Sequence, residues 1–265
     1  MSLGAGAAGA NRVLYQTIDT KRRSDYPPGM SDARLTYTED GVVAIIALDD
    51  GRANALSPAM QADIGAALDR AEAAGLVVLL TGRQGRFSGG FDLGVMGAGG
   101  PDAAGMVVGG FELARRLLTF PRPVVIACTG HAVAMGAFLL TAADARIGIA
   151  GGGHRVQANE VAIGMTLPRS AIEMCRGVLA PAALRRALDL ATPFSHEEAV
   201  VAGFLDVVVP EDQLAARAHE EAERLAGLDA NAHRHTKLLT RADRLSALDV
   251  AIEADRADLV ALFTG

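Results

Sequence analysis

The 265-residue chain is half hydrophobic and carries 31 acidic against 25 basic residues, a formal net charge of −6. This length suffices for one main core, and the acidic balance argues against nucleic acid, so we expect a small-molecule partner. No apolar run reaches the roughly 18 residues of a membrane span, so we expect no membrane partner. Cys128 and Cys175 lack CxxC spacing, which favours a reducing compartment, and we expect a cytoplasmic protein.

Residues 1–31 are predicted to form a flexible tail of small and charged residues. Within it, "GAGAAG" (residues 4–9) formally matches the GxGxxG pattern of dinucleotide-binding proteins. That pattern functions between a strand and a helix, and no strand precedes it here, so a flexible tail is favoured over a nucleotide site.

The regular pattern begins at Arg34, where residues 34–50 read as two short strands joined by a turn. A helix follows, with Ser57 as N-cap, Pro58 at its first position and Gly75 as its stop. The unbroken apolar run at residues 76–82 predicts a strand buried on both faces. It leads into the glycine-rich residues 82–100, which we expect to be a loop that approaches a ligand closely.

The second half of the chain alternates in the same way. A helix at residues 111–120 precedes a buried strand at 124–128, and a second loop then leads into a helix that starts near Ala134. Further expected elements are a strand at 145–150, helices at 170–179 and 181–191, a capping box at Ser195 and Glu198, a strand at 205–209 and helices to the end. This alternation predicts an α/β fold whose layers surround a buried sheet.

The two loops suggest a chemistry. Each follows a buried strand, and they end at Phe91 and at Met135. A loop of this kind can direct a free backbone N–H into a cleft, and two such donors form an oxyanion hole. Each donor lowers the barrier by about 3 kcal/mol when charge develops on a carbonyl oxygen, and a thioester enolate is a suitable species.

Four motifs resemble, in order and spacing, those of the crotonase superfamily, the enoyl-CoA hydratase/isomerase family. They are "GRANALS" (51–57), "GRFSGGFDL" (85–93), "PRPVVIACTGHAVAMGAF" (121–138) and "VQANEVAIGM" (156–165). The resemblance implies an α/β crotonase-like (ClpP/crotonase) fold of repeated ββα units over residues 32–210. A C-terminal helical segment, residues 211–265, packs at trimer contacts in such relatives and helps to close the acyl site.

The resemblance also implies partners and residue roles. It implies an acyl-CoA substrate, a homotrimer or hexamer, and no metal or separate cofactor beyond the coenzyme A of the thioester. The oxyanion N–H groups would belong to Phe91, which follows Gly90, and to Met135. The segment similar to "RANALS" would line the CoA with backbone groups, which carries over to Ala53, Ala55 and Leu56.

Two departures from the family pattern affect the expected reaction. Most relatives have three glycines where this chain has Ala134, Met135 and Gly136, so the Met135 side chain either narrows the acyl pocket or packs in the core. Hydratases of the family use two glutamates; here Phe138 occupies the first position and Glu160 aligns with the second. One carboxylate suits a 1,3-proton shift, which favours 3-enoyl to 2-enoyl-CoA isomerisation. A 2-enoyl-CoA hydratase and a non-catalytic acyl-CoA-binding protein are the alternatives.

Three other side chains were candidates for chemistry. Asp92 follows Phe91 and is either a substitute acid or, as favoured here, a cap for local backbone N–H groups. His233 and His235 form an HxH pattern without an acidic or Cys partner at metal spacing, so surface histidines are favoured over a metal pair.

Overall fold

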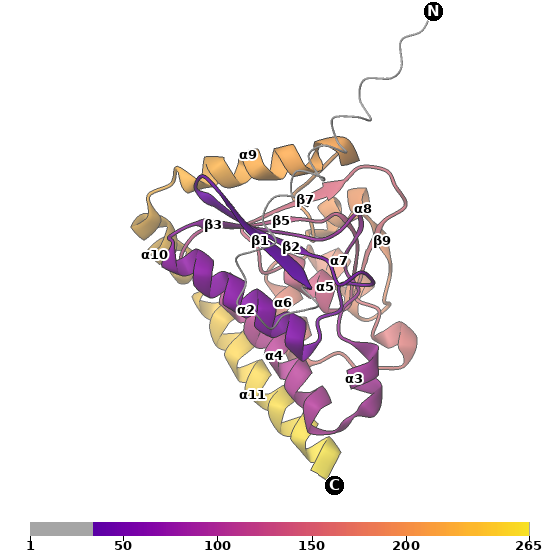
Figure 1. The fold of residues 1–265 in the computed structure, drawn as a ribbon. Coiled ribbons are helices and arrows are strands. Elements are labelled where there is room, and N and C mark those ends of the chain that lie inside the picture. Colours follow the sequence, from indigo (N-terminus) through magenta and orange to yellow (C-terminus); the bar gives the residue numbers. More distant parts are fainter. Residues whose placement is uncertain (1–33, 265) are drawn as a thin grey trace, which may run out of the picture. The chain divides into compact units, whose positions relative to one another are not determined.

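The computed structural model describes residues 34–264 (Figure 1). The predicted tail at residues 1–31, with its GxGxxG-like segment, lies outside the described residues. Within residues 34–264, no helix is both long enough and apolar enough to cross a bilayer.

A six-stranded sheet has the strand order β1-β2-β3-β5-β7-β10. Its strands are β1 (Leu35–Asp40), β2 (Val43–Leu48), β3 (Val77–Thr81), β5 (Val124–Ala127), β7 (Ala145–Ile149) and β10 (Val207–Val209). The first two form the predicted antiparallel hairpin, and every other neighbouring pair is parallel. The strands predicted from unbroken apolar runs are confirmed as the centre of this sheet.

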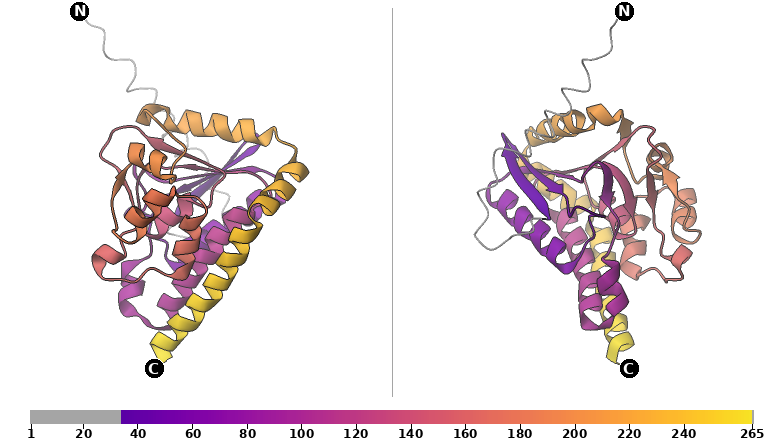
Figure 2. Two further views of the ribbon diagram at one scale, coloured as in Figure 1. Left: turned by 180° about the vertical axis from the view of Figure 1, so that it is seen from behind. Right: turned by 45° about the vertical axis from the view of Figure 1, so that its right-hand side comes forward.

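Both faces of the sheet are buried, which explains why its central strands are apolar throughout. In β3, Val78 and Leu80 belong to the main core, whereas Val77 and Leu79 face helix α9 (Leu214–Ala226). Helices α2 (Pro58–Ala73), α4 (Gly100–Thr119) and α5 (Met135–Leu140) cover the main-core face. Figures 1 and 2 show α9 on one side of the sheet and α2 and α4 on the other.

A second, four-stranded sheet has the order β4-β6-β8-β9. It comprises β4 (Gly85–Ser88), β6 (Gly130–Val133), β8 (Arg155–Gln157) and β9 (Phe194–Ser195), of which the first three are parallel. The prediction of continuous loops around β4 and β6 was therefore wrong. These strands are too short to show a hydrophobic period, and their backbones approach closely: a Cβ on Gly130 would lie 1.9 Å from the carbonyl carbon of Gly85.

Helix α2 has the boundaries and caps that its sequence predicts, whereas α4 starts earlier than predicted. The Ser57 side chain accepts a hydrogen bond from the Met60 N–H, and Gly75 adopts a φ of +67° after the helix. Helix α4 starts at Gly100 rather than near residue 111, and α3 (Leu93–Ala98) lies within the predicted loop. The glycines of α4 disfavour a helix by propensity, but a Cβ on Gly110 would lie 2.5 Å from the Phe91 ring. Close packing accounts for that glycine.

The remaining helices lie in the second half of the chain. They are α6 (Arg169–Arg176), α7 (Pro181–Leu188), α8 (His196–Ala202), α10 (Ala230–Thr240) and α11 (Ala242–Thr264), with short 3₁₀ turns η1 (Val161–Ile163) and η2 (Glu211–Gln213). The capping box of Ser195 and Glu198 is present at the start of α8. Helix α11 packs along α4 and α6 (Figure 2). The domain boundary placed at residue 210 stays a prediction.

Candidate active site

The site is built where the parallel strands of the small sheet end. Ser88 of β4 pairs with Ala132 of β6, which in turn pairs with Val156 of β8. The carboxyl ends of these strands therefore meet at one edge, the usual place for a ligand site in a parallel sheet. The segments that leave this edge carry Phe91, Met135 and Glu160, the predicted catalytic residues.

The two predicted oxyanion donors are free. Within residues 34–264, neither the Phe91 N–H nor the Met135 N–H donates a hydrogen bond. The preceding amides are engaged, since the Gly90 N–H donates to Ser88 Oγ (3.2 Å) and the Ala134 N–H donates to the Gln157 carbonyl (2.8 Å). Met135 opens α5, where the first N–H groups have no partner within the helix.

The two turns that present these amides touch one another. A Cβ on Gly90 would lie 2.7 Å from the Ala134 Cβ and 3.3 Å from the Met135 nitrogen. Gly90 has a φ of +91°, and Ala134 has a φ of +51°, a conformation that disfavours any residue with a Cβ. The structure thus places the two free donors on adjoining turns, as an oxyanion hole requires.

Asn54, which the sequence did not single out, links β2, β4 and the turn at Gly90 by hydrogen bonds. Its buried side-chain amide donates to the carbonyls of Leu48 (3.0 Å) and Phe87 (3.1 Å), which joins the ends of β2 and β4. Its own carbonyl accepts a hydrogen bond from Ser88 Oγ (2.8 Å), the group that also receives the Gly90 N–H. The available signal was the position of Asn54 inside the "GRANALS" motif.

The predicted CoA-binding segment lies directly against the first turn. The Gly89 N–H donates to the Ala53 carbonyl, and the Leu56 N–H donates to the Gly90 carbonyl, both at 2.8 Å. The Leu56 side chain is buried, whereas Ala53 and Ala55 keep partial exposure. The structure brings this segment beside the oxyanion turn, and its contact with CoA stays a prediction.

Glu160 is a buried carboxyl group with few hydrogen-bond partners. It is 7% exposed, and its Oε2 atom has no hydrogen-bond partner among the described residues. Burial raises the pKa of Glu160 to about 7, because a charged carboxylate is poorly solvated there. Burial also raises the pKa of the nearby Cys175 thiol to about 12, and the negative charge of Glu160 contributes to that rise. A carboxyl group with a pKa near 7 can both take and return a proton near neutral pH.

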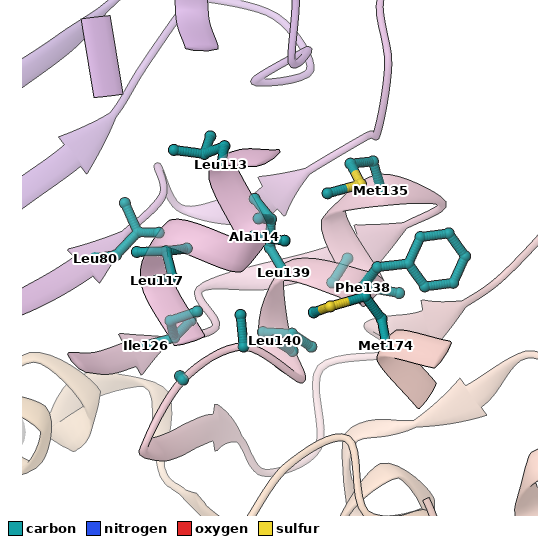
Figure 3. Close-up of a cluster of buried hydrophobic side chains, with 14 of the residues drawn as sticks. Leu80, Leu113, Ala114, Leu117, Ile126, Met135, Phe138, Leu139, Leu140 and Met174 are labelled. Atoms are coloured by element: carbon teal, nitrogen blue, oxygen red, sulfur yellow. The ribbon is translucent and has the colours of Figure 1, made fainter. Parts of the chain in front are cut away.

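Two side chains of α5 distinguish this site from one with two carboxylates. Met135 has no exposed surface and packs in the cluster drawn in Figure 3, which supports the core-packing interpretation of its side chain. Phe138 is 1% exposed and stacks on Phe111 at 6.2 Å between ring centroids. Phe111 in turn meets the Phe91 ring edge-on at 6.2 Å. Position 138, where the resemblance predicts the first glutamate of a hydratase, therefore holds a buried aromatic side chain.

Of the other candidates, Asp92 has a structural role. Asp92 is the N-cap of α3, where its Oδ1 atom accepts the N–H groups of Gly94 (2.8 Å) and Val95 (3.0 Å). The favoured capping interpretation of Asp92 is confirmed. His235 is exposed, whereas His233 is half-buried two residues earlier on α10, so the two rings leave the helix in different directions. Among the described residues, no cluster of three or more His, Cys, Asp or Glu side chains is arranged to hold a metal ion.

Comparisons with known proteins agree with this geometry. A family model described as enoyl-CoA hydratase/isomerase matches residues 38–264. The enoyl-CoA hydratase domain-containing protein 3 of rat mitochondria is 33% identical over 207 residues, which cover 75% of this chain and 67% of the relative. Among solved structures, an enoyl-CoA isomerase of Mycobacterium tuberculosis is 45% identical with a TM-score of 0.82, covering 86% of this chain and 99% of that one.

The names of the relatives span two reactions. The same M. tuberculosis protein is called a probable enoyl-CoA hydratase in a second solved structure. The human mitochondrial Δ3-Δ2-enoyl-CoA isomerase is 27% identical with a TM-score of 0.81, covering 87% of this chain and 92% of that one. Because the family model spans nearly all the described residues and the structural neighbours share the fold, the chain belongs to the enoyl-CoA hydratase/isomerase family and has the crotonase fold.

Proposed function

We propose that this protein catalyses the isomerisation of 3-enoyl-CoA to 2-enoyl-CoA thioesters. The observation that carries the proposal is a single buried carboxyl group, Glu160, in a site where Phe138 occupies the position that the resemblance gives to the first hydratase glutamate. A 1,3-proton shift needs one group that accepts a proton from one carbon and returns it to another.

The proposed reaction has two steps, proton removal from C2 and proton delivery to C4. The Glu160 carboxylate removes a proton from C2 of the 3-enoyl thioester, and the electrons of that C–H bond form a dienolate with negative charge on the thioester oxygen. The N–H groups of Phe91 and Met135 stabilise that oxygen. The protonated Glu160 then delivers the proton to C4, the double bond forms between C2 and C3, and the carboxylate is regenerated. Ala53, Ala55 and Leu56 are proposed to contact the CoA portion through their backbone groups.

Hydration of 2-enoyl-CoA is the second candidate, because relatives of this chain carry both names. Hydration requires a water molecule held in line with C3 as well as a proton donor, and effective positioning accounts for much of such a rate. An aromatic residue at position 138 provides neither a hydrogen-bond acceptor nor a base for that water. A protein that binds acyl-CoA without turnover is the third candidate, which the absence of any reaction would support.

One experiment distinguishes the three candidates. Purified protein is offered 3-enoyl-CoA and 2-enoyl-CoA thioesters separately, in ordinary water and in D₂O. In D₂O, deuterium that enters the substrate reports proton transfer, and its absence would favour binding without turnover. We expect consumption of the 3-enoyl substrate, slow or absent hydration of the 2-enoyl substrate, and loss of about 10²–10⁴-fold in kcat for Glu160→Gln. Glu220→Gln, an isosteric change at an exposed position of α9, is the matched control. Faster hydration than isomerisation, or an undiminished rate in Glu160→Gln, would refute the proposal.

The family relation also supports a homotrimer or hexamer, which we propose for the protein in solution. Light scattering coupled to size-exclusion chromatography measures the mass of the assembly, to be compared with multiples of the 27.4 kDa chain. A single species at the monomer mass would contradict this part of the proposal.

A further inference from the structure

The start of helix α6 is capped from a distant part of the chain. Pro168, the residue at its N-cap position, makes no side-chain hydrogen bond, so the first N–H groups of the helix need another acceptor. Asp255 of α11 supplies it: Oδ1 accepts the Arg169 N–H (3.0 Å), and Oδ2 accepts the Ser170 N–H (2.8 Å). Oδ2 also accepts the Ser170 hydroxyl at 2.6 Å. One carboxylate therefore satisfies both leading amides of α6.

This contact is buried, unlike the ion pairs around it. Asp255 is 6% exposed and Ser170 has no exposed surface. The Arg169 side chain lies 3.4 Å from Asp255 and 2.6 Å from Asp258, whose side chain is 65% exposed. Exposed pairs of that kind contribute little. A buried carboxylate at a helix N-terminus, by contrast, accepts charge-assisted hydrogen bonds and interacts favourably with the helix dipole.

The loop between Glu160 and α6 depends on its two ends. Residues 161–166 are all exposed, so the loop has few packing contacts of its own. Inside it, the N–H groups of Ile163 (3.1 Å) and Met165 (2.9 Å) both donate to the Glu160 carbonyl. The loop is thus a local turn anchored by β8 before Glu160 and by α6 after it.

Helix α6 also forms part of the surroundings of the Glu160 carboxyl group. Its buried face comprises Ser170, Ala171, Met174 and Cys175. Cys175 is close enough to Glu160 for the glutamate charge to affect the thiol, and the other charged group that acts on Cys175 is Arg244 of α11. A displacement of α6 would therefore change both the loop position and the access of water to Glu160.

We infer that Asp255 is a positioning residue. By capping α6 from α11, it fixes the loop that connects Glu160 to α6 and keeps the Glu160 carboxyl group out of water. The C-terminal helix thereby acts on the site without contributing a group to the reaction. The inference rests on the proposed function only in treating Glu160 as the acid/base.

The first test measures loop order and is independent of any activity. Hydrogen–deuterium exchange of peptides covering residues 160–170 is compared among the full-length wild type, Asp255→Asn, Ser170→Ala and Asp258→Asn. We expect faster exchange in Asp255→Asn and a smaller increase in Ser170→Ala, which loses only the hydroxyl contact. Asp258→Asn is the matched control, because it removes an exposed partner of Arg169 and leaves the capped amides intact. Exchange unchanged in both Asp255→Asn and Ser170→Ala would overturn the inference.

The second test measures the consequence for Glu160. We expect kcat of Asp255→Asn to fall by roughly 10- to 100-fold with a smaller change in KM. The midpoint of the pH–kcat/KM profile is expected to move from near 7 toward the ordinary glutamate value of 4.5, as water enters. A purely structural role would lower Tm and the yield of folded protein but leave that midpoint in place, which would overturn the inference. If Glu160→Gln remains fully active while the exchange result holds, the proposed function fails and the capping role of Asp255 stands.

Discussion

Replacing Gly90 by alanine tests whether the contact between the two turns sets the oxyanion geometry. The new Cβ would meet the Ala134 Cβ at 2.7 Å and the Val133 carbonyl oxygen at 2.9 Å, distances at which the backbone must move. The φ of +91° at Gly90 adds conformational strain, on the order of 1–2 kcal/mol for a residue with a Cβ. Both effects displace the peptide that carries the Phe91 N–H.

A matched control separates the strain from the displacement. Gly85 also has a positive φ, +75°, but a Cβ there would meet no atom within 4 Å. Gly85→Ala should therefore lose roughly 1–2 kcal/mol of stability with kcat within a factor of a few. Gly90→Ala should lose stability and, in addition, about 10²–10³-fold in kcat, the cost of one oxyanion donor.

The assay is kcat for 3-enoyl-CoA consumption, measured beside urea unfolding of each variant. Because both family reactions pass through charge on the thioester oxygen, the same comparison is informative with 2-enoyl-CoA. A folded Gly90→Ala protein whose kcat equals that of Gly85→Ala would refute the coupling of the two turns.

Three further predictions concern ionisable side chains. Because the pKa of Glu160 is raised from 4.5 to about 7, the folded state binds more protons than the unfolded state between these values, so stability falls as pH rises through that window. Glu160→Gln removes this loss, and urea unfolding should show its advantage over wild type growing with pH to at most about 3 kcal/mol. Asp92→Ala should cost about 1 kcal/mol of unfolding free energy with kcat unchanged; a kcat lost in Asp92→Asn would instead indicate an acid role. Lys237 is 5% exposed and pairs with Asp144 at 2.6 Å, and Asp144 also pairs with Arg241 at 2.7 Å. Lys237→Met removes one of these two partners and should cost about 1–3 kcal/mol, against less than about 1 kcal/mol for Arg70→Met in an exposed pair.

Local patterns predicted the elements that depend on local interactions. Helix α2 carries its own N-cap, first-turn proline and terminal glycine, and all three appear in the structure. The central strands β3 and β5 of the large sheet are apolar on both faces, so their burial was readable from composition alone. The short strands β4, β6 and β8 were missed because, unlike β5, they are not unbroken apolar runs but contain glycine or polar residues, and pairing with one another defines them.

In the candidate site, too, the features that depend on local sequence were predicted and the long-range contacts were not. The glycine-rich turns pointed to free backbone amides at Phe91 and Met135, and the motif resemblance pointed to Glu160. Asn54 and Asp255 were not found, since their partners lie 33 and 85 residues away in the sequence. No local spacing indicates a hydrogen bond across such distances.

The sequence by itself determined the fold family, the two turns that present free amides, and the presence of Phe138 and Glu160 in the motifs that resemble the family. Tertiary structure alone decided that these turns touch, that Glu160 is buried with its Oε2 atom unpaired among the described residues, and that α11 caps α6. The physical reason is range: backbone conformation and capping depend on residues a few positions apart, whereas burial and pKa depend on every group that folding brings nearby.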